Sequence, residues 1–338
     1  MNIGIDVMSG DKAPLEIIKG AFAALQMFPM INVTLIGNEK IIKTICSSLL
    51  YKLDDNRIQI VHTESVITMD DKPLCVVREK SDSSMAVGLR LLSEGITDAF
   101  VSAGNTGALH AGSTLIVRRI KGIARSAIAT ILPFDEPLML IDSGANTEVT
   151  KENLGQFAIM GSIYTEKIFG LQRPRVGLAN NGTEPGKGTR SLVEAYQYLS
   201  ELPHINFIGN VEGSQIPFSV CDVLVCDGLI GNIILKHTES MAKFFLLKLR
   251  ELFMRNAVTK LSAAVMKPAF SGFKKTFNAS EYGGAPMLGI SKPVIKAHGS
   301  SDAEAVKNAV RQAIEYINTG IIVDIVKAIV PEKGTDPK

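Results

Sequence analysis

The chain has no tryptophan, only six tyrosines and little excess of either charge. Its 36 Lys and Arg residues nearly balance its 34 Asp and Glu residues, so the formal net charge is only +2. Proteins that bind nucleic acid usually carry a basic block, often with aromatic residues on which bases stack. The sequence contains no such block, and we therefore expect no nucleic-acid partner.

Cysteine is scarce as well, and long apolar runs are missing. The four cysteines are scattered, and Cys221 and Cys226 lack the neighbouring ligands of a zinc site. We expect them to be small core residues of a reduced protein that holds no metal. No run reaches the ~18 apolar residues of a membrane-spanning helix. The N-terminus reads as a strand that contains Asp6 rather than as a signal peptide, so we expect a cytoplasmic protein.

What the chain does contain is a regular alternation of short apolar segments and amphipathic ones. With 46% hydrophobic residues among 338, it can bury a large core as one α/β domain or two packed lobes. Alternating strands and helices predict a mainly parallel sheet covered by helices on both faces. Strands are predicted at 3–5, 32–36, 57–62, 99–101, 127–132, 138–141, 175–178, 206–208, 223–226 and 294–297. Helices are predicted at 15–26, after 38, at 85–93, 106–118, 151–169, 192–199 and from 302 to 321.

One stretch, residues 99–108, joins a strand to a loop of small residues that opens a helix at about Thr106. Gly104 lacks a Cβ, so backbone N–H groups there can approach a ligand closely. Ser102, Asn105 and Thr106 add side-chain donors, and a helix N-terminus adds unpaired N–H groups. The stretch predicts a phosphate-binding loop, with an ordinary strand-to-helix turn as the alternative.

Other predicted strands also end in polar residues, which is where α/β proteins place their sites. The first strand ends at Asp6. Asp142 and Asn146 follow the strand at 138–141. We expect Asp142 to orient a donor or to hold a lysine, because it would repel a phosphate. Lys187 lies in a glycine-rich loop that loosely resembles a phosphate loop but lacks the Walker A spacing.

The last two strands end in a similar way. After the strand at 223–226, Asp227 and Lys236 are candidates for an ion pair across a site. Asn232 is a candidate to donate a hydrogen bond to a ligand oxygen. A surface salt bridge near a helix start is the alternative. After the strand at 294–297, the position of His298 favours a ligand contact or general acid–base catalysis. Two serines follow it, Ser300 and Ser301.

A different pattern begins at about residue 233. Residues 241–254 and 264–277 carry apolar residues at helical spacing with Lys and Arg between them. Two such helices predict a projecting hairpin at about 240–278, used for dimerisation, a membrane surface or a lipid-like substrate. Core-facing amphipathic helices are the alternative. Residues 331–338 are predicted to be a disordered tail.

Taken in order, these blocks resemble those of the PlsX-type phosphate acyltransferases of bacterial phospholipid synthesis. The resemblance runs from Ile3 to about Ile317. Two places depart from the family pattern: Ser9 stands where the first loop usually has glycine, and the loop at 179–187 differs. The matching blocks are Ser102-Ala-Gly-Asn-Thr-Gly-Ala-Leu109, Gln156-Phe-Ala-Ile-Met-Gly-Ser162, Asn206-Phe-Ile-Gly-Asn-Val-Glu-Gly213, Cys226-Asp-Gly228 with Gly231-Asn232, Tyr282-Gly-Gly-Ala-Pro286 and Ala297-His-Gly-Ser-Ser-Asp302.

The resemblance implies a three-layer α/β/α fold like that of phosphate acetyltransferases and isocitrate/isopropylmalate dehydrogenases. It implies one catalytic domain, residues 1–330, made of two intimately packed lobes. The implied reaction moves a long-chain acyl group from acyl carrier protein to inorganic phosphate, giving acyl phosphate. The implied partners are a second copy of the chain and the cytoplasmic membrane or a glycerol-3-phosphate acyltransferase in it. No metal or organic cofactor is implied.

On this reading, phosphate binds at residues 102–106, and Lys187 or Lys236 neutralises its charge. A phosphate oxygen then attacks the thioester directly, without an acyl-enzyme. Three alternatives remain. The first is a phosphate acetyl- or butyryltransferase, in which coenzyme A carries the acyl group. The second is a metal- and NAD-dependent dehydrogenase with the same fold. The third is a non-catalytic scaffold that binds carrier protein or membrane. Candidates to hold the oxyanion are Asn232, His298 and the Ser300/Ser301 region.

Overall fold

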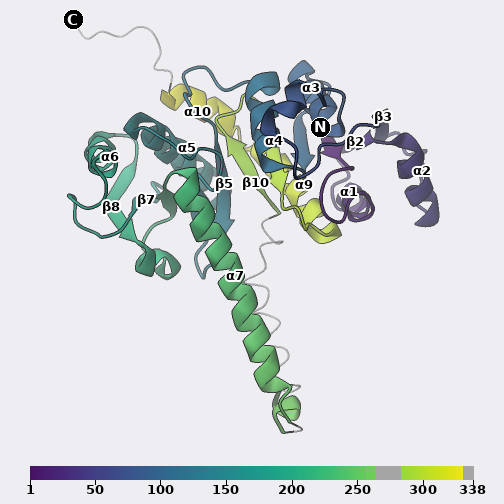
Figure 1. Cartoon of the computed structure of the whole chain (residues 1–338). Coiled ribbons are helices and arrows are strands. Elements are labelled where there is room, and N and C mark those ends of the chain that lie inside the picture. Colours follow the sequence, from purple (N-terminus) through teal and green to yellow (C-terminus); the bar gives the residue numbers. More distant parts are fainter. Residues whose placement is uncertain (257, 264–282, 330–338) are drawn as a thin grey trace, which may run out of the picture.

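The computed structural model describes residues 1–256, 258–263 and 283–329. Its strands form one sheet in the order β3-β2-β1-β4-β11-β10-β5-β6-β9-β7-β8 (Figure 1). The strands are β1 (Asn2–Asp6), β2 (Asn32–Gly37), β3 (Ile58–His62), β4 (Ala99–Ser102), β5 (Ala127–Leu132), β6 (Leu138–Ile141), β7 (Arg175–Asn180), β8 (Asn206–Glu212), β9 (Val223–Val225), β10 (Gly284–Leu288) and β11 (Val294–Ala297). The α-helices are α1 (Leu15–Met27), α2 (Glu39–Ser48), α3 (Ser84–Glu94), α4 (Thr106–Gly112), α5 (Lys151–Phe169), α6 (Arg190–Glu201), α7 (Gly228–Phe253), α9 (Ala303–Asn318) and α10 (Ile321–Ile329).

The sheet has two parallel halves joined through antiparallel strands. In one half β3, β2, β1, β4 and β11 run parallel, and in the other β6, β9, β7 and β8 do. Between them β10 pairs antiparallel with β11 and β5, and β5 pairs antiparallel with β6. The predicted mainly parallel α/β sheet is therefore confirmed.

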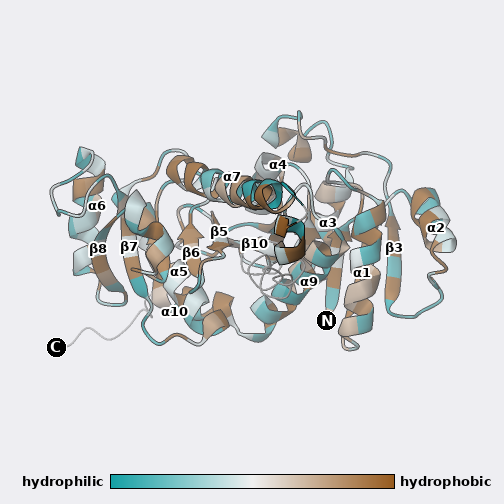
Figure 2. Ribbon diagram, turned by 90° about the horizontal axis from the view of Figure 1, so that it is seen from below, coloured by the Kyte–Doolittle hydropathy of each residue, from teal (hydrophilic) through white to brown (hydrophobic). Residues whose placement is uncertain are grey.

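Alternate residues along the strands fill separate cores on the two faces, as the pleat requires. On one face, side chains such as Ile3, Ile5 and Ile141 pack with α1, α5, α9 and α10. On the other face, α3 and α4 cover one half of the sheet, and residues of α7 cover the other. Figure 2 shows these helices on either side of the brown, apolar strands. The result is the predicted three-layer arrangement.

The end of the chain differs from the prediction of one helix to residue 321. α9 ends at Asn318, and Gly320 adopts φ +67°, a left-handed conformation that breaks the helix. A second helix, α10, then packs on α5. The periodicity of 303–318 continues into α10, so apolar spacing alone did not show the break.

α7 is a 26-residue helix that leaves the body and projects from it (Figure 1). Its outer half corresponds to the first predicted helix of the hairpin. The second predicted helix, at 264–277, and the predicted tail at 331–338 lie outside the described residues. Within the described part of the chain, no helix is both long and apolar enough to cross a membrane.

Candidate functional site

The loop after β4, predicted to seat phosphate, uses its side chains inside the protein. Ser102 Oγ donates to Asp6 Oδ2 at 2.8 Å and accepts from the backbone N–H of Gly104 at 3.1 Å. Asn105 Oδ1 caps α4 by accepting from Ala108 N at 3.0 Å. The Asn105 amide nitrogen donates to three backbone carbonyls, those of Thr68, Met69 and Asp71. Of the predicted side-chain donors, only Thr106, exposed at the start of α4, remains open to a ligand.

Asp6 is fully buried at the tip of β1, where hydroxyl groups surround its carboxylate. Burial raises the pKa of Asp6, while the hydroxyls of Ser84, Ser9 and Ser102 oppose that rise. Ser9 does not have a positive φ; the left-handed position is the next residue, Gly10, at φ +117°. The departure of Ser9 from the family pattern therefore causes no backbone strain, and its hydroxyl faces Asp6.

The loop after β6 is held by Asp142, which binds backbone rather than a lysine. The Asp142 carboxylate accepts from the backbone N–H groups of Ile128, Gly144, Ala145 and Asn146. The Asn146 amide donates to Ser126 O and to Asp142 Oδ2, both at 2.8 Å. These two predicted site residues thus build the loop itself, because their polar atoms are engaged within it.

α7 begins against this loop. Gly228 N donates to Asn146 O at 2.6 Å. A Cβ on Gly231 would lie 1.9 Å from Asp142 O, so only glycine permits this approach. The side chain of Asn232 lies over Gly144, 3.7 Å from where a Cβ would stand. Asn232 and the 142–146 loop are therefore neighbours, a contact that the sequence did not predict.

Asp227 serves as the N-cap of α7 and does not pair with Lys236. Its Oδ1 accepts from Ile230 N at 2.9 Å, which satisfies one of the open N–H groups of the first turn. Lys236 pairs instead with Glu239 on the same helix, at 3.1 Å. The predicted Asp227–Lys236 pair is thus replaced by a cap and a separate ion pair.

The strongest cluster of reactive groups joins α7 to the tip of β11. Lys236 Nζ lies 3.4 Å from His298 Nε2. Glu239 Oε2 lies 3.1 Å from Lys236 Nζ and 3.8 Å from His298 Nε2. His298 and Lys236 are each about half exposed, at 50% and 54%, whereas Glu239 is only 18% exposed. We call these three residues the anion cluster.

The tautomer of His298 follows from its other nitrogen. Nδ1 accepts from the backbone N–H of Ser300 at 3.2 Å, with Ser300 Oγ at 2.9 Å. A backbone N–H can only donate, so a neutral imidazole that accepts it carries its proton on Nε2; the Lys236 ammonium, which also can only donate, then makes no hydrogen bond to Nε2. Burial lowers the pKa of His298, as do the charges of Lys236, Lys296 and Lys243, while Glu239 opposes them. The cluster therefore presents a neutral N–H donor beside an ammonium group.

Two more charged residues surround the cluster. Burial, together with the charge of Lys236, lowers the pKa of Lys296 to about 8, while Asp11 opposes this shift. Lys296 donates to the carbonyl of Ala297. Asp11 N donates to Gly299 O at 2.8 Å, so the loop after β1 packs against the tip of β11.

Glu239, Lys296 and Asp11 were not predicted from the sequence, although a signal for Glu239 was present. Residues 232, 236, 239 and 243 follow spacings of four, three and four, which place Asn, Lys, Glu and Lys on one helix face. That face touches the 142–146 loop through Asn232 and the β11 tip through Lys236. It therefore links the two halves of the sheet.

The remaining predicted residues lie apart from this cluster. Lys187 is exposed in the loop after β7 and pairs with Glu184 at 3.6 Å. Ser301 is buried, and its backbone N–H donates to His298 O at 3.0 Å, so it shapes the turn. The four cysteines are free and buried. Among the described residues, no group of three or more His, Cys, Asp or Glu side chains could hold a metal ion.

Comparisons with known proteins agree on one family. A family model described as "Fatty acid synthesis protein" matches residues 1–324. The chain is 46% identical over 323 residues to a phosphate acyltransferase of Thermoanaerobacter pseudethanolicus, covering 95% of each chain. It is 45% identical over 330 residues to a phosphate acyltransferase of Alkaliphilus oremlandii, covering 97% of each. A solved phosphotransacetylase from Streptococcus pyogenes, 18% identical, aligns over 97% of this chain and 94% of that one with a TM-score of 0.60, a likeness of fold.

Proposed function

The chain belongs to the family of fatty acid synthesis proteins, and we propose that it is a phosphate acyltransferase that moves a long-chain acyl group from acyl carrier protein to inorganic phosphate. The alignments cover nearly the whole length of this chain and of its relatives. The activity in the relatives' names therefore belongs to proteins of about the same extent as this chain, which supports the proposal. The carrier protein and the acyl chain are the parts of this proposal that need a direct test.

The observation that supports it best is the convergence of Lys236 Nζ and the His298 Nε2–H, 3.4 Å apart, at a strand tip. Both groups are about half exposed, so an anion from solution can reach them, and Glu239 is the carboxylate that they share. We place the phosphate here rather than at residues 102–106, whose side-chain donors are largely engaged. An ammonium group and a neutral N–H would bind two of its oxygens.

The same geometry gives a direct reaction. A bound phosphate oxygen attacks the carbonyl carbon of the thioester, a C–O bond forms, and the carbonyl electrons move onto oxygen. When they return, the C–S bond breaks and the thiolate leaves with its electron pair, a good leaving group because its thiol has a pKa near 8.5. We assign the transient oxyanion to the amide of Asn232, which lies on the same helix face as Lys236.

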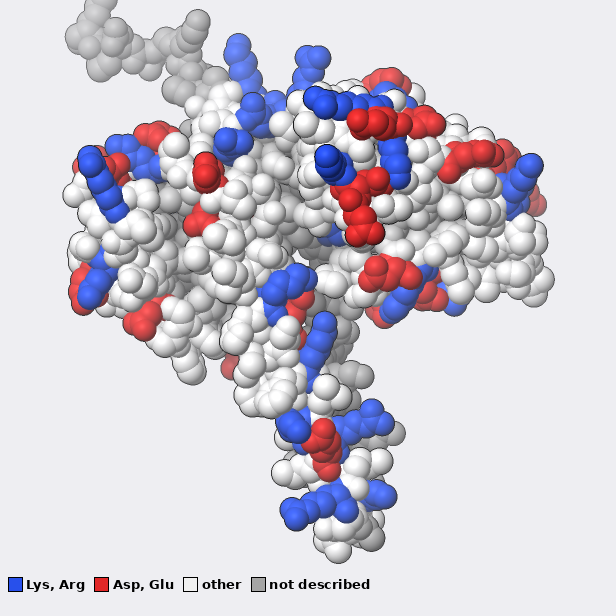
Figure 3. All heavy atoms as spheres, viewed as in Figure 1, with Lys and Arg blue, Asp and Glu red and all other residues white. Residues whose placement is uncertain are grey.

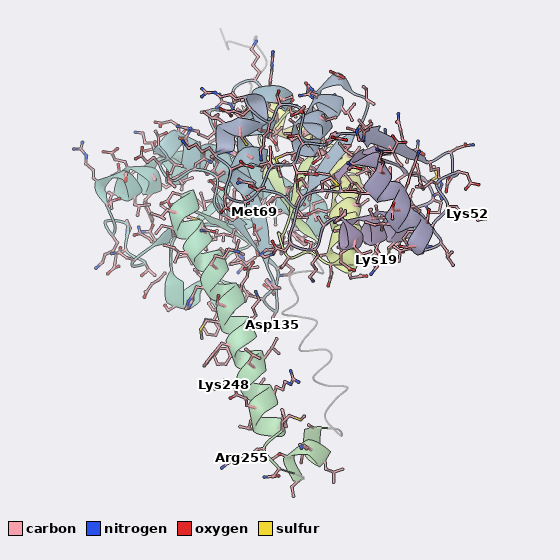
Figure 4. The ribbon with its side chains drawn as sticks, turned by 45° about the vertical axis from the view of Figure 1, so that its right-hand side comes forward. Lys19, Lys52, Met69, Asp135, Lys248 and Arg255 are labelled. Carbon is pink, nitrogen blue, oxygen red and sulfur yellow. The ribbon has the colours of Figure 1, made fainter. Side chains whose placement is uncertain are left out.

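The projecting part of α7 supports an acidic carrier protein as the acyl donor. Lys248 stands on it and Arg255 just beyond its last residue, Phe253, both away from the body (Figure 4). Figure 3 shows Lys and Arg side chains along this part of the surface. Phe244, Phe245 and Leu247 are about half exposed between them, which also fits a second copy of the chain or a membrane surface.

The test is release of free carrier-protein thiol from palmitoyl-acyl carrier protein, with and without inorganic phosphate. We expect phosphate-dependent release that falls at least tenfold in Lys236→Ala. The matched control is Lys43→Ala, an exposed lysine of α2 that makes a comparable ion pair within its helix, with Glu39 at 2.6 Å. Release from acyl-coenzyme A but not from the carrier protein would favour the coenzyme A reaction. No release from either donor would reject the proposal.

A further inference from the structure

Glu239 is an unexpected neighbour for an anion. Its carboxylate stands 3.1 Å from Lys236 Nζ and 3.8 Å from His298 Nε2, the two donors that would hold phosphate. A fixed negative charge so close to a bound anion repels it, since both charges are the same sign. A site built only to attract an anion would leave this position neutral.

The exposure of Glu239 separates it from an ordinary helix ion pair. Lys248 and Glu251 make the same i,i+3 pair further along α7, with side chains 57% and 66% exposed. The Glu239 side chain is 18% exposed and is shared with His298, a residue from a different element 59 positions away in the numbering of the chain. Glu239 is therefore held inside the site rather than on a solvated face.

Inorganic phosphate differs from sulfate by the proton that it keeps at neutral pH. Hydrogen phosphate can donate this proton to a carboxylate, which turns a repulsion into a charge-assisted hydrogen bond. Sulfate has the same shape but carries no proton, so beside Glu239 it meets only repulsion. A carboxylate among cationic donors thus selects for a protonated anion.

We propose that Glu239 accepts a hydrogen bond from the protonated oxygen of hydrogen phosphate, and that the anion cluster thereby selects phosphate over sulfate. This inference rests on the proposed function, because it assigns a specificity residue to the same site. Lys236 and His298 bind the unprotonated oxygens, one of which attacks the thioester. Three positive charges act on His298 from two elements: Lys236 and Lys243 from α7 and Lys296 from β11.

The experiment compares phosphate KM with the inhibition constant of sulfate, competitive with phosphate, in the full-length protein at neutral pH. For the unmodified protein we expect sulfate to bind at least tenfold more weakly than phosphate. In Glu239→Gln, which keeps the size of the side chain, we expect sulfate to bind about tenfold more tightly while phosphate binds no more tightly. Glu251→Gln, the matched control, should leave both constants unchanged.

A purely structural role for Glu239 gives a different result. If Glu239 only holds Lys236 in place, Glu239→Gln weakens phosphate and sulfate in parallel, and their ratio stays that of the unmodified protein. That outcome overturns the inference. Calorimetric titration with each anion alone gives the same ratio without an acyl donor, so a variant with no turnover still reports on selection.

Lys236→Met separates this inference from the proposed site. If phosphate binds Lys236→Met as well as the unmodified protein, the anion lies elsewhere, and the proposed site and this inference fail together. If Lys236→Met weakens both anions at least tenfold while Glu239→Gln leaves their ratio unchanged, the site stands and only the role of Glu239 is rejected.

Discussion

At the scale of single residues, His298 is the group whose chemistry is most sharply defined. Ser300 N–H fixes its Nδ1 as an acceptor, which leaves Nε2–H for the substrate. We expect His298→Ala to raise the phosphate KM about tenfold or more, because the hydrogen bond from the imidazole N–H to the charged phosphate is lost. His298→Gln can place an amide N–H near the former Nε2 and should lose less. The phosphate dependence of thiol release measures both, and equal losses in the two variants would contradict this role.

Lys296 makes phosphate binding depend on pH. Its pKa is lowered to about 8, so its ammonium group loses its proton as the pH rises through that value. We expect the phosphate KM to rise above about pH 8, since a positive charge near the site disappears. Lys296→Arg keeps its charge and should remove this rise, because a guanidinium does not titrate in that range. If the phosphate KM depends on pH in the same way in both proteins, Lys296 is not the group that causes the rise.

The same shift affects stability. The folded pKa of Lys296, about 8, lies below its usual value of 10.5, so between these values the unfolded chain binds more protons. Stability therefore rises with pH across that window, and at neutral pH the buried charge is a cost. We expect Lys296→Met to raise the free energy of unfolding at pH 7 by roughly 1 kcal/mol and to weaken phosphate binding. Urea unfolding at pH 7 tests this, and a destabilised variant would contradict it.

The sequence located most strand-tip residues but not their partners. Asn105 and Asn146 were expected at a ligand site, and Asp142 was expected to orient a donor or to hold a lysine, but all three bind backbone groups of the protein. Polar residues at a strand tip look alike in sequence whether they bind substrate or shape the loop. Glu239 was missed because its partner His298 comes from another element, so only the folded chain brings the pair together.

At the scale of elements, the contact between α7 and the 142–146 loop depends on Gly231. A Cβ there would stand 1.9 Å from Asp142 O, so Gly231→Ala must push the helix away. We expect a loss of about 2–3 kcal/mol in the free energy of unfolding, typical of overpacking, together with lower activity. Gly213→Ala is the control, because a Cβ there meets nothing within 4 Å. Thermal unfolding measures both, and similar values for the two variants would contradict the account.

Element boundaries followed the sequence where caps or turns are strong. The helix predicted at 151–169 matches α5, which starts at a capping box on Thr150 and ends at Gly170 in the left-handed conformation. The break at Gly320 was missed because the apolar spacing continues on both sides of it. A single glycine in such a pattern reads as a helix interior until the packing of α10 on α5 is known.

At the scale of the whole molecule, the site lies where the helix face of α7 spans both halves of the sheet. The fold and family were readable from sequence because many short blocks occur in the family's order across nearly the whole chain. The position of the anion cluster could not be predicted from the sequence, because it depends on how the tip of β11 contacts α7. The division into two lobes of one catalytic domain stays a prediction.

The projecting half of α7 offers a test of the carrier protein. Lys248 lies on it and Arg255 just past its end, far from the strand tips (Figure 4). We expect Lys248→Glu with Arg255→Glu to raise the KM for acyl carrier protein several-fold, because charge reversal slows association with an acidic partner. The KM for phosphate should not change. If the KM values for phosphate and for acyl carrier protein rise equally, or if the KM for acyl carrier protein does not depend on salt, the carrier protein does not dock at this surface.

The most direct measurement of the central claim is a crystal structure of the protein with inorganic phosphate bound. The account predicts density for phosphate within hydrogen-bond distance of Lys236 Nζ and His298 Nε2, beside Glu239. Density at residues 102–106, with the anion cluster empty, would contradict it and return the phosphate site to the loop after β4.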